Sequence, residues 1–150
     1  MTTGKNLCFL LMAKLQIQVI TQEQLLTEMA AESITLPASE GEITVLPGHL
    51  PLFSKLKPGN VIIRDDAESQ VLAVWGGFVD IAADRVVIMA DTAVRAEEID
   101  ESKAEAARRK AEELMKKNLS KVEFLQAEAS LRKALLELKT VKRWKKARQR

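Results

Sequence analysis

The sequence predicts a β-sandwich formed by residues 13–95, followed by an antiparallel pair of helices formed by residues 96–150. From Lys14 to about Ala90, apolar residues alternate with polar ones or form short runs, as β-strands require. After Ala96 they recur at steps of three and four residues, which is the period of amphipathic helices. The charge balance changes at the same point. Residues 1–96 carry seven Lys and Arg against eleven Asp and Glu, whereas residues 97–150 carry sixteen against ten. The two parts should therefore face different partners.

The first twelve residues have no place in this pattern. Lys5 is followed by the short apolar stretch Leu7–Leu11, which is too short for a membrane span and has no small-residue cleavage pattern after it. Two interpretations remain, an export signal or an upstream translation start with Met12 as the working one, and we favour the second. Residues 1–12 are thus expected to be disordered or absent from the native protein. The single cysteine, Cys8, excludes an internal disulfide and fits a reducing compartment.

Short apolar runs at regular spacing predict the strands. In the first run Leu15, Ile17 and Val19 alternate with polar residues, as in a strand with one buried face. The other runs are the one that closes with Ile34 and Leu36, then Ile43–Val45, Val61–Arg64, Val71–Trp75, Phe78–Ala82 and Val86–Ala90. Glycine, proline or acidic residues separate most of them, which indicates a sandwich or barrel rather than βαβ units.

Two helices follow. Asp100 is the expected N-cap of the first helix, which should end near Asn118. Ser120 and Glu123 form the capping box of the second helix, and a break of three residues makes the two helices antiparallel. The apolar stripe of the first helix is Ala104, Ala107, Ala111, Leu114 and Met115, and that of the second is Phe124, Ala127, Leu131, Ala134, Leu135, Leu138 and Val141.

The first of these stripes is mostly alanine, which buries little apolar area, so the packing between the helices should be weak. A weak seam suits a helical pair that opens, but a permanently docked pair remains equally compatible with the pattern. The end of the second helix is strongly basic, because residues 139–150 contain seven Lys and Arg, no acidic residue, and Trp144. Such a segment could bind nucleic acid or an anionic membrane, or could be a solvated tail.

The sequence contains no pattern of catalytic or metal-binding residues. His49 is the only histidine, and it lies in the segment Leu46–Phe53, where two prolines and a glycine predict a shaped loop. No nucleophile and base accompany it, and one histidine without further ligands makes a poor metal site. Gly76 and Gly77 predict a tight connection or a close approach of two backbones, while a conventional phosphate-binding loop is absent.

The most specific motif is the segment Glu40–Leu52, which reads EGEITVLPGHLPL and is followed by LKPG at residues 56–59. The segments GGFV at 76–79 and ADTA at 90–93 accompany it. Together these motifs resemble the epsilon subunit of F-type ATP synthases, and the resemblance extends from about Ala13 to the C-terminus. It agrees with the two-part architecture, which the periodicity predicts independently.

The resemblance implies a non-catalytic, regulatory subunit of the central rotor, peripheral on the cytoplasmic side of the cell inner membrane. In that family the sandwich binds the gamma subunit and rests on the ring of c subunits, coupling proton flow to rotation. The helical pair lies folded against the sandwich or extends along gamma into the catalytic head of alpha and beta subunits, where it blocks ATP hydrolysis. Glu42 and His49 match family positions at the rotor interface. The residues that would meet an acidic segment of a catalytic beta subunit are Arg132, Lys133, Lys139, Lys142 and Arg143.

Some members of this family bind ATP at a motif that opens the first helix. The corresponding segment here, Ile99–Ala104, contains Asp100 but has Lys103 where the family pattern has arginine. Val94 also stands where ATP-binding members place an acid. Because lysine lacks the planar, bidentate fork of arginine, the resemblance implies weak ATP binding at most and no other cofactor.

Two alternatives belong to other functional classes. A nucleic-acid-binding module would combine a small β-barrel with the basic helical arm, but it would need stacking aromatic residues, and the chain has no Tyr, four Phe and two Trp. An enzyme with His49 as a lone acid or base would lack visible partner residues. Neither a nucleic-acid partner nor a direct membrane contact is therefore expected, and the membrane is approached only through the complex.

Overall fold

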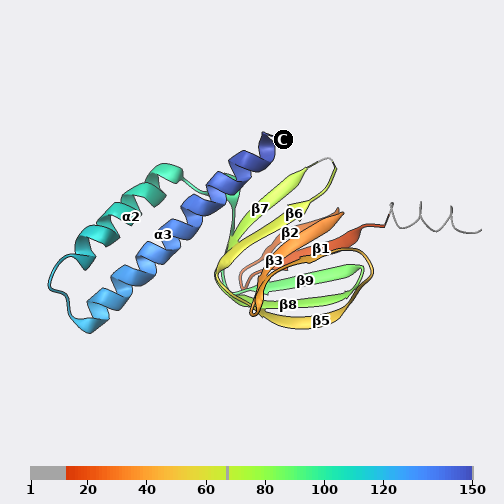
Figure 1. The fold of residues 1–150 in the computed structure, drawn as a ribbon, viewed down its shortest axis with the longest axis horizontal. Helices are drawn as coiled ribbons and strands as arrows, with labels where there is room; N and C mark the ends of the chain where they lie inside the picture. The colour runs from red at the N-terminus through yellow and green to blue at the C-terminus, as the bar shows by residue number, and fades with distance from the viewer. Residues whose placement is uncertain (1–12, 67, 150) are drawn as a thin grey trace, which may run out of the picture. The chain divides into compact units, whose positions relative to one another are not determined.

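The computed structural model describes residues 13–66 and 68–149, and the chain divides into two compact units between Ala93 and Val94 (Figure 1). The first unit is built from strands and the second mainly from helices. The predicted fold class, a β-sandwich followed by a helical hairpin, is confirmed. The prediction for residues 1–12 lies outside the described residues.

The strands form one hydrogen-bonded sheet that folds over into two layers (Figure 1). Their order is β10-β7-β6-β3-β5-β8-β9-β1-β2, and β4 pairs with β3 beside this path. Strands β3 and β5 share a single pair, Ala38 with Leu56, where the sheet turns from one layer to the other. The strands are β1 (Leu15–Ile20), β2 (Leu25–Ala31), β3 (Ser33–Ala38), β4 (Gly41–Val45), β5 (His49–Leu56), β6 (Gly59–Arg64), β7 (Ser69–Val74), β8 (Gly77–Ala83), β9 (Arg85–Ala90) and β10 (Ala93–Arg95).

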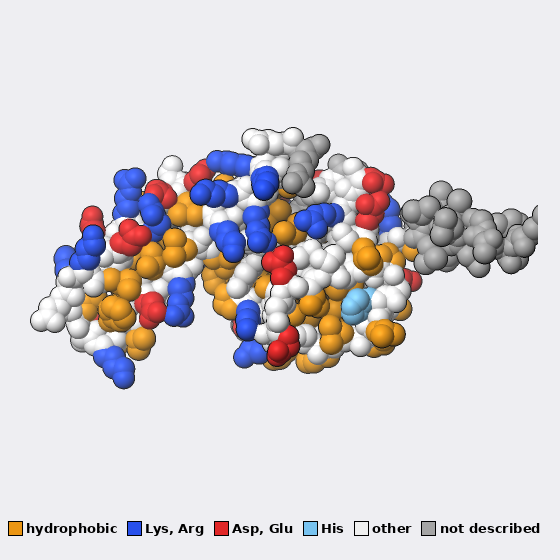
Figure 2. Space-filling model, in the orientation of Figure 1, with side chains coloured by type: hydrophobic (Ala, Val, Ile, Leu, Met, Phe, Trp, Pro, Cys, Tyr) orange, Lys and Arg blue, Asp and Glu red, His pale blue; other side chains and the backbone are white. Residues whose placement is uncertain are grey.

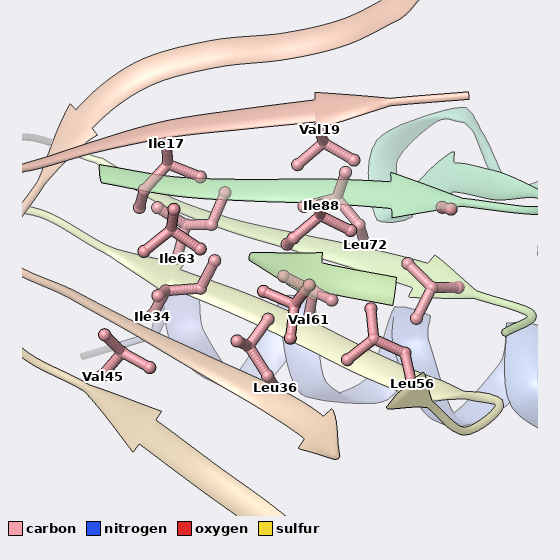
Figure 3. Close-up of a cluster of buried hydrophobic side chains, with 14 of the residues drawn as sticks. Ile17, Val19, Ile34, Leu36, Val45, Leu56, Val61, Ile63, Leu72 and Ile88 are labelled. Carbon is pink, nitrogen blue, oxygen red and sulfur yellow. The ribbon is translucent and has the colours of Figure 1, made fainter. Parts of the chain in front are cut away.

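The core of the sandwich lies between the two layers, and its side chains come from both (Figure 3). In β1 the predicted residues Leu15, Ile17 and Val19 are fully buried, which confirms the alternation in this strand. Every member of the buried cluster lies between Leu15 and Ala90. The sandwich thus has a core of its own, made from within the first unit.

Three strands were not predicted. Strand β2 lacks a clean alternation, because Leu26 and Thr27 are neighbours in sequence and both are buried. Strand β10 has only three residues, too few to carry a period. Strand β5 contains much of the segment predicted to be a loop, and that prediction was wrong. Pro51 is tolerated because the pairing of β5 with β8 shifts between His49 and Leu52, where one extra residue bulges out of the ladder.

Gly77, at the start of β8, allows the closest backbone approach of the sandwich. Its φ is +123°, and a Cβ atom at this position would lie 2.2 Å from the carbonyl oxygen of Met89. Only glycine fits this geometry. Of the two alternatives predicted at Gly76 and Gly77, the close backbone approach is therefore confirmed, and it lies where β8 pairs with β9.

The second unit contains the short 3-10 helix η1 (Ala96–Glu98) and the helices α2 (Glu101–Met115) and α3 (Lys121–Arg148). Both predicted N-caps are confirmed. The Asp100 carboxylate accepts a hydrogen bond from the backbone N–H of Lys103 at 3.2 Å. The Ser120 Oγ and the Glu123 carboxylate complete a capping box, with the Glu123 N–H donating to Ser120 Oγ at 3.3 Å. Hydrogen bonds from the Ser120 backbone and hydroxyl to the carboxylate lower the pKa of Glu123.

Small side chains line the seam between the two helices. The buried residues of the seam are Ala104 and Ala111 in α2 and Ala127, Ala134 and Val141 in α3. An ion pair closes the open end of the seam, since Lys145 Nζ lies 2.5 Å from a Glu101 carboxylate oxygen.

Two details of the helix predictions were wrong. Helix α2 ends at Met115 rather than near Asn118, so the break before α3 is longer than three residues. Phe124 and Leu135, placed on the packed stripe, are instead 40% and 47% exposed, because alanine-lined helices approach too closely to cover large side chains at the edge of the seam.

Candidate interaction surfaces

The outer face of the β5-β8-β9-β1-β2 layer carries a row of apolar side chains that are exposed or, at Ile20, half-buried. The register aligns them across the strands, since Phe78 pairs with Met89 and Met89 pairs with Ile20. Phe53 stacks on Phe78 with ring centroids 5.6 Å apart and an interplanar angle of 14°. We call this row the outer strip, and its members are Ile20, Leu25, Phe53, Phe78 and Met89.

The outer strip is a surface that favours contact with another molecule. Phe53 is 64% exposed and Phe78 is 44% exposed, although both side chains are large and apolar. Their neighbours in the same strands, Val79, Ile81 and Ile88, point to the other side and fill the core. Strands β8 and β9 are therefore apolar on both faces at this end. An outward-facing apolar row of this kind is typical of a protein-binding surface.

A second apolar patch lies at the opposite end of β5, around the turn that leads into this strand. Leu46 is 59% exposed and Leu50 is 80% exposed. The turn is anchored by Asp84, whose carboxylate accepts a hydrogen bond from the Gly48 N–H at 3.1 Å. We call Leu46 and Leu50 the end patch. His49 lies between its two members, and Figure 2 shows the pale blue histidine close to hydrophobic side chains on the visible surface.

The structure does not bring Glu42 and His49 together. Glu42 pairs with Pro37 in β3, and the carbonyl of Pro37 accepts a hydrogen bond from Lys57, just past the end of β5. His49 begins β5 and pairs with Ala83. The two residues therefore lie in different strands, on either side of the turn in which the His49 N–H donates to the Leu46 carbonyl at 3.2 Å.

The predicted cationic residues of α3 all lie outside the seam with α2. At 100° per residue, Arg132, Lys139 and Arg143 fall in one narrow sector of the helix, with Lys142 next to it. Lys133 lies about 100° from Arg132, around the helix. Arg132 donates from Nη2 to Glu128 Oε1 at 2.6 Å. These side chains therefore form a broad cationic surface rather than a single row.

Within the predicted nucleotide motif, Asp100 serves as the N-cap of α2. One carboxylate oxygen of Asp100 is engaged by the N-terminal turn of α2, as described above. Lys103 is exposed on the first turn of the same helix. Within the described ranges, no group of three or more His, Cys, Asp or Glu side chains could hold a metal ion. No described helix is both long enough and apolar enough to cross a membrane.

The outer strip was not predicted, and Phe53 and Phe78 are the residues that sequence reasoning missed. The available signal was the composition of the strands: Val86-Val87-Ile88-Met89 is apolar at consecutive positions, so it presents apolar side chains on both faces. The stacking of Phe53 on Phe78 depends on the register between β5 and β8, which the bulge sets and which the sequence pattern does not reveal.

A sandwich with an exposed apolar strip, joined to a helical pair with a cationic surface, is the architecture of a small protein-binding subunit. Residues 14–96 match the family model of the β-sandwich domain of the ATP synthase delta/epsilon chain, and residues 97–142 match the model of its long α-helix domain. The chain belongs to the ATP synthase delta/epsilon family.

Bacterial epsilon chains are among its similar relatives. ATP synthase epsilon chain 2 of Ralstonia nicotianae is 39% identical over 91% of this chain and 99% of the relative. The epsilon chain of Chromobacterium violaceum is 37% identical over 90% and 98%. Among solved structures, a chain in a cryo-EM structure of the Euglena gracilis mitochondrial ATP synthase, described as OSCP/F1/c-ring, superposes with a TM-score of 0.70 at 25% identity, covering 80% of this chain and 76% of that one.

A chain from the central stalk and c-ring structure of the Tetrahymena thermophila mitochondrial ATP synthase shares the fold. Its TM-score is 0.55 at 17% identity, and the match covers 85% of this chain and 96% of that one. The family and its architecture thus agree with the resemblance that the motifs carry.

Proposed function

We propose that this chain is a non-catalytic subunit of a proton-translocating ATP synthase, peripheral on the cytoplasmic side of the inner membrane. It couples rotation of the c-subunit ring to the catalytic head, and its C-terminal helices inhibit ATP hydrolysis. The observation that carries the proposal is the separation of surfaces in an epsilon-family chain. Its apolar outer strip belongs to the first unit, whereas its cationic surface belongs to the second.

In this proposal the sandwich makes the rotor contacts. The outer strip binds the gamma subunit, because a partner that covers it removes two large aromatic side chains from water. The end patch, with His49 beside it, faces the loops of the c ring. Since Glu42 lies in β4 and His49 begins β5, a rotor interface that includes both residues spans the turn between these two strands.

The helical pair supplies the inhibition. Its seam is lined mainly by alanine, so opening the pair exposes little apolar surface. The cations Arg132, Lys133, Lys139, Lys142 and Arg143 then bind an acidic segment of a catalytic beta subunit, and charge complementarity favours this state over a random contact. Neither half of this function needs a catalytic residue in the chain.

Co-purification tests the proposal as a whole. A tagged copy of the chain, expressed in its own organism, should recover the gamma subunit and the c ring together with the alpha and beta subunits. A tagged copy that carries Phe53→Thr and Phe78→Thr, present at equal level, is the control for contacts unrelated to the outer strip. Recovery of the tagged chain without a gamma subunit would overturn the proposal.

We expect the isolated chain to bind ATP only weakly, with a Kd of about 100 μM or higher, because Lys103 offers a point charge where a bidentate fork is needed. Asp100 is also engaged in capping α2. Lys103→Arg alone should improve the affinity little, since Val94 still leaves the motif without its acid. Titration calorimetry measures both variants, and micromolar affinity of the unaltered chain would refute this expectation.

A further inference from the structure

The turn that leads from β4 into β5 has a defined geometry. The His49 N–H donates to the Leu46 carbonyl at 3.2 Å, and Gly48 has a φ of +80°. Proline at the second position and a positive φ at the third are the features of a type II β-turn. The end patch consists of the first residue of this turn, Leu46, and of Leu50, which follows it. The direction in which the end patch points is therefore linked to the conformation of the turn.

The peptide group between Pro47 and Gly48 is the variable part of such a turn. Types I and II differ mainly by a rotation of this central peptide through roughly 160°, which reverses the direction of its N–H and C=O groups. Here the central N–H, that of Gly48, donates to Asp84 Oδ1 at 3.1 Å. A rotated peptide would turn this N–H away and bring its carbonyl oxygen toward the carboxylate. The hydrogen bond to Asp84 therefore favours type II over type I.

Asp84 lies in the tight turn between β8 and β9, and its own backbone is held in place. Its carbonyl oxygen accepts a hydrogen bond from the Gln16 N–H of β1 at 2.6 Å. The preceding residue, Ala83, pairs with His49 and has a φ of +49°. Among residues 13–66 and 68–149, Ala83 is the only residue other than glycine with a positive φ. Such a backbone conformation persists only where its surroundings enforce it, and it is concentrated at functional positions.

We propose that Asp84 is a positioning residue for the end patch: by holding the Gly48 N–H, it keeps the turn in the conformation that contacts the c ring. This inference rests on the proposed contact between the end patch and the c ring. Leu46 and Leu50 are strongly exposed, so packing within the sandwich restrains them little. A surface whose conformation is already fixed loses less conformational freedom on binding, so the hydrogen bond raises the affinity without adding a contact.

Amide hydrogen exchange of Gly48 in the full chain, followed by NMR, tests the structural step. Asp84→Ala removes the acceptor and should raise the exchange rate of this N–H by about fivefold or more, because one hydrogen bond is lost. Asp84→Asn removes the same charge but keeps an oxygen that accepts, so it should change the rate by less than about twofold. An unchanged rate in Asp84→Ala would overturn the proposal. Equal acceleration in both variants would also overturn it, because the charge and not the acceptor would then be responsible.

Binding to the c ring tests the functional step. The chain in complex with the gamma subunit is titrated with detergent-solubilised c ring from the same organism. Asp84→Ala should lower the affinity by about fivefold, which is the effect of one hydrogen bond, and Asp84→Asn should stay within about twofold of the unaltered chain. Lower affinity without faster exchange of the Gly48 N–H would contradict the positioning role, because Asp84 would then act by direct contact.

The double variant Leu46→Thr/Leu50→Thr tests the end patch separately, because it leaves Asp84 and the turn residues Pro47 and Gly48 unchanged. If this variant lowers the affinity for the c ring and Asp84→Ala does not, the positioning role is wrong and the proposed contact with the c ring stands. If neither variant lowers the affinity, the proposed contact itself is wrong, and the positioning role with it.

Discussion

Replacing Phe53 and Phe78 by threonine should lower the affinity of the chain for the gamma subunit by roughly 100-fold or more. Each side chain exposes about half of its surface on the outer strip. Burial of about 100 Å² of apolar area per ring contributes roughly 2.5 kcal/mol, and the mutual stacking of the rings adds to this. Threonine keeps the β-propensity of both positions. Isothermal titration with purified gamma subunit measures the effect.

The fold of the double variant should be retained, because both side chains point away from the core that β5 and β8 help to enclose. The matched control is Leu46→Thr/Leu50→Thr, which removes two exposed apolar side chains of the end patch. It should leave the affinity for isolated gamma within about threefold, since the end patch lies at the other end of β5. Unchanged affinity in the Phe53 and Phe78 variant would show that gamma binds elsewhere.

The parts of the fold that the sequence predicts well are those that local chemistry determines. Asp100 and the pair Ser120 and Glu123 satisfy the first backbone N–H groups of the two helices. Capping of this kind depends only on residues that are close in sequence, so it can be predicted without the rest of the chain. The alternation of Leu15, Ile17 and Val19 is equally local. Helix α2, by contrast, ends three residues before the predicted position, although Lys116 and Lys117 are good helix formers, so intrinsic preference does not set its end.

The candidate surfaces could be predicted only where they coincide with a contiguous motif. His49 lies in such a motif, but its surroundings depend on strand β5. That strand was not predicted, because the two prolines and the glycine of the segment indicated a loop. The outer strip depends on the register of strands that are distant in sequence: Met89 meets Ile20 through a parallel pairing across nearly the whole first unit. Long-range pairing of this kind leaves no trace in local periodicity, so the surface emerges only once the sheet is assembled.

Truncation after Ala96 should raise the rate of ATP hydrolysis by the assembled enzyme, by roughly threefold or more if most molecules rest in the inhibited state. The sandwich should remain folded and assembled, because its buried cluster draws every member from residues 15–90. Proton pumping per ATP hydrolysed should stay nearly constant, since the rotor contacts belong to the first unit. Hydrolysis assays on membranes with verified subunit content measure the rate.

Charge reversal in the full chain distinguishes the effect of the cationic side chains on ATP hydrolysis from the effect of having the two helices present. Changing Arg132, Lys133, Lys139 and Lys142 to glutamate should reproduce the effect of truncation, because several like-charge contacts would disfavour the inhibited state. The matched control reverses four exposed lysines elsewhere on the helical pair, Lys110, Lys116, Lys117 and Lys121, which gives the same change in net charge. If inhibition depends on the named cations, the control should hydrolyse ATP at the rate of the unaltered enzyme.

Unchanged hydrolysis in both the truncated and the charge-reversed enzyme would instead identify the helical pair as a fixed brace, and its alanine-lined seam would then have no role in switching.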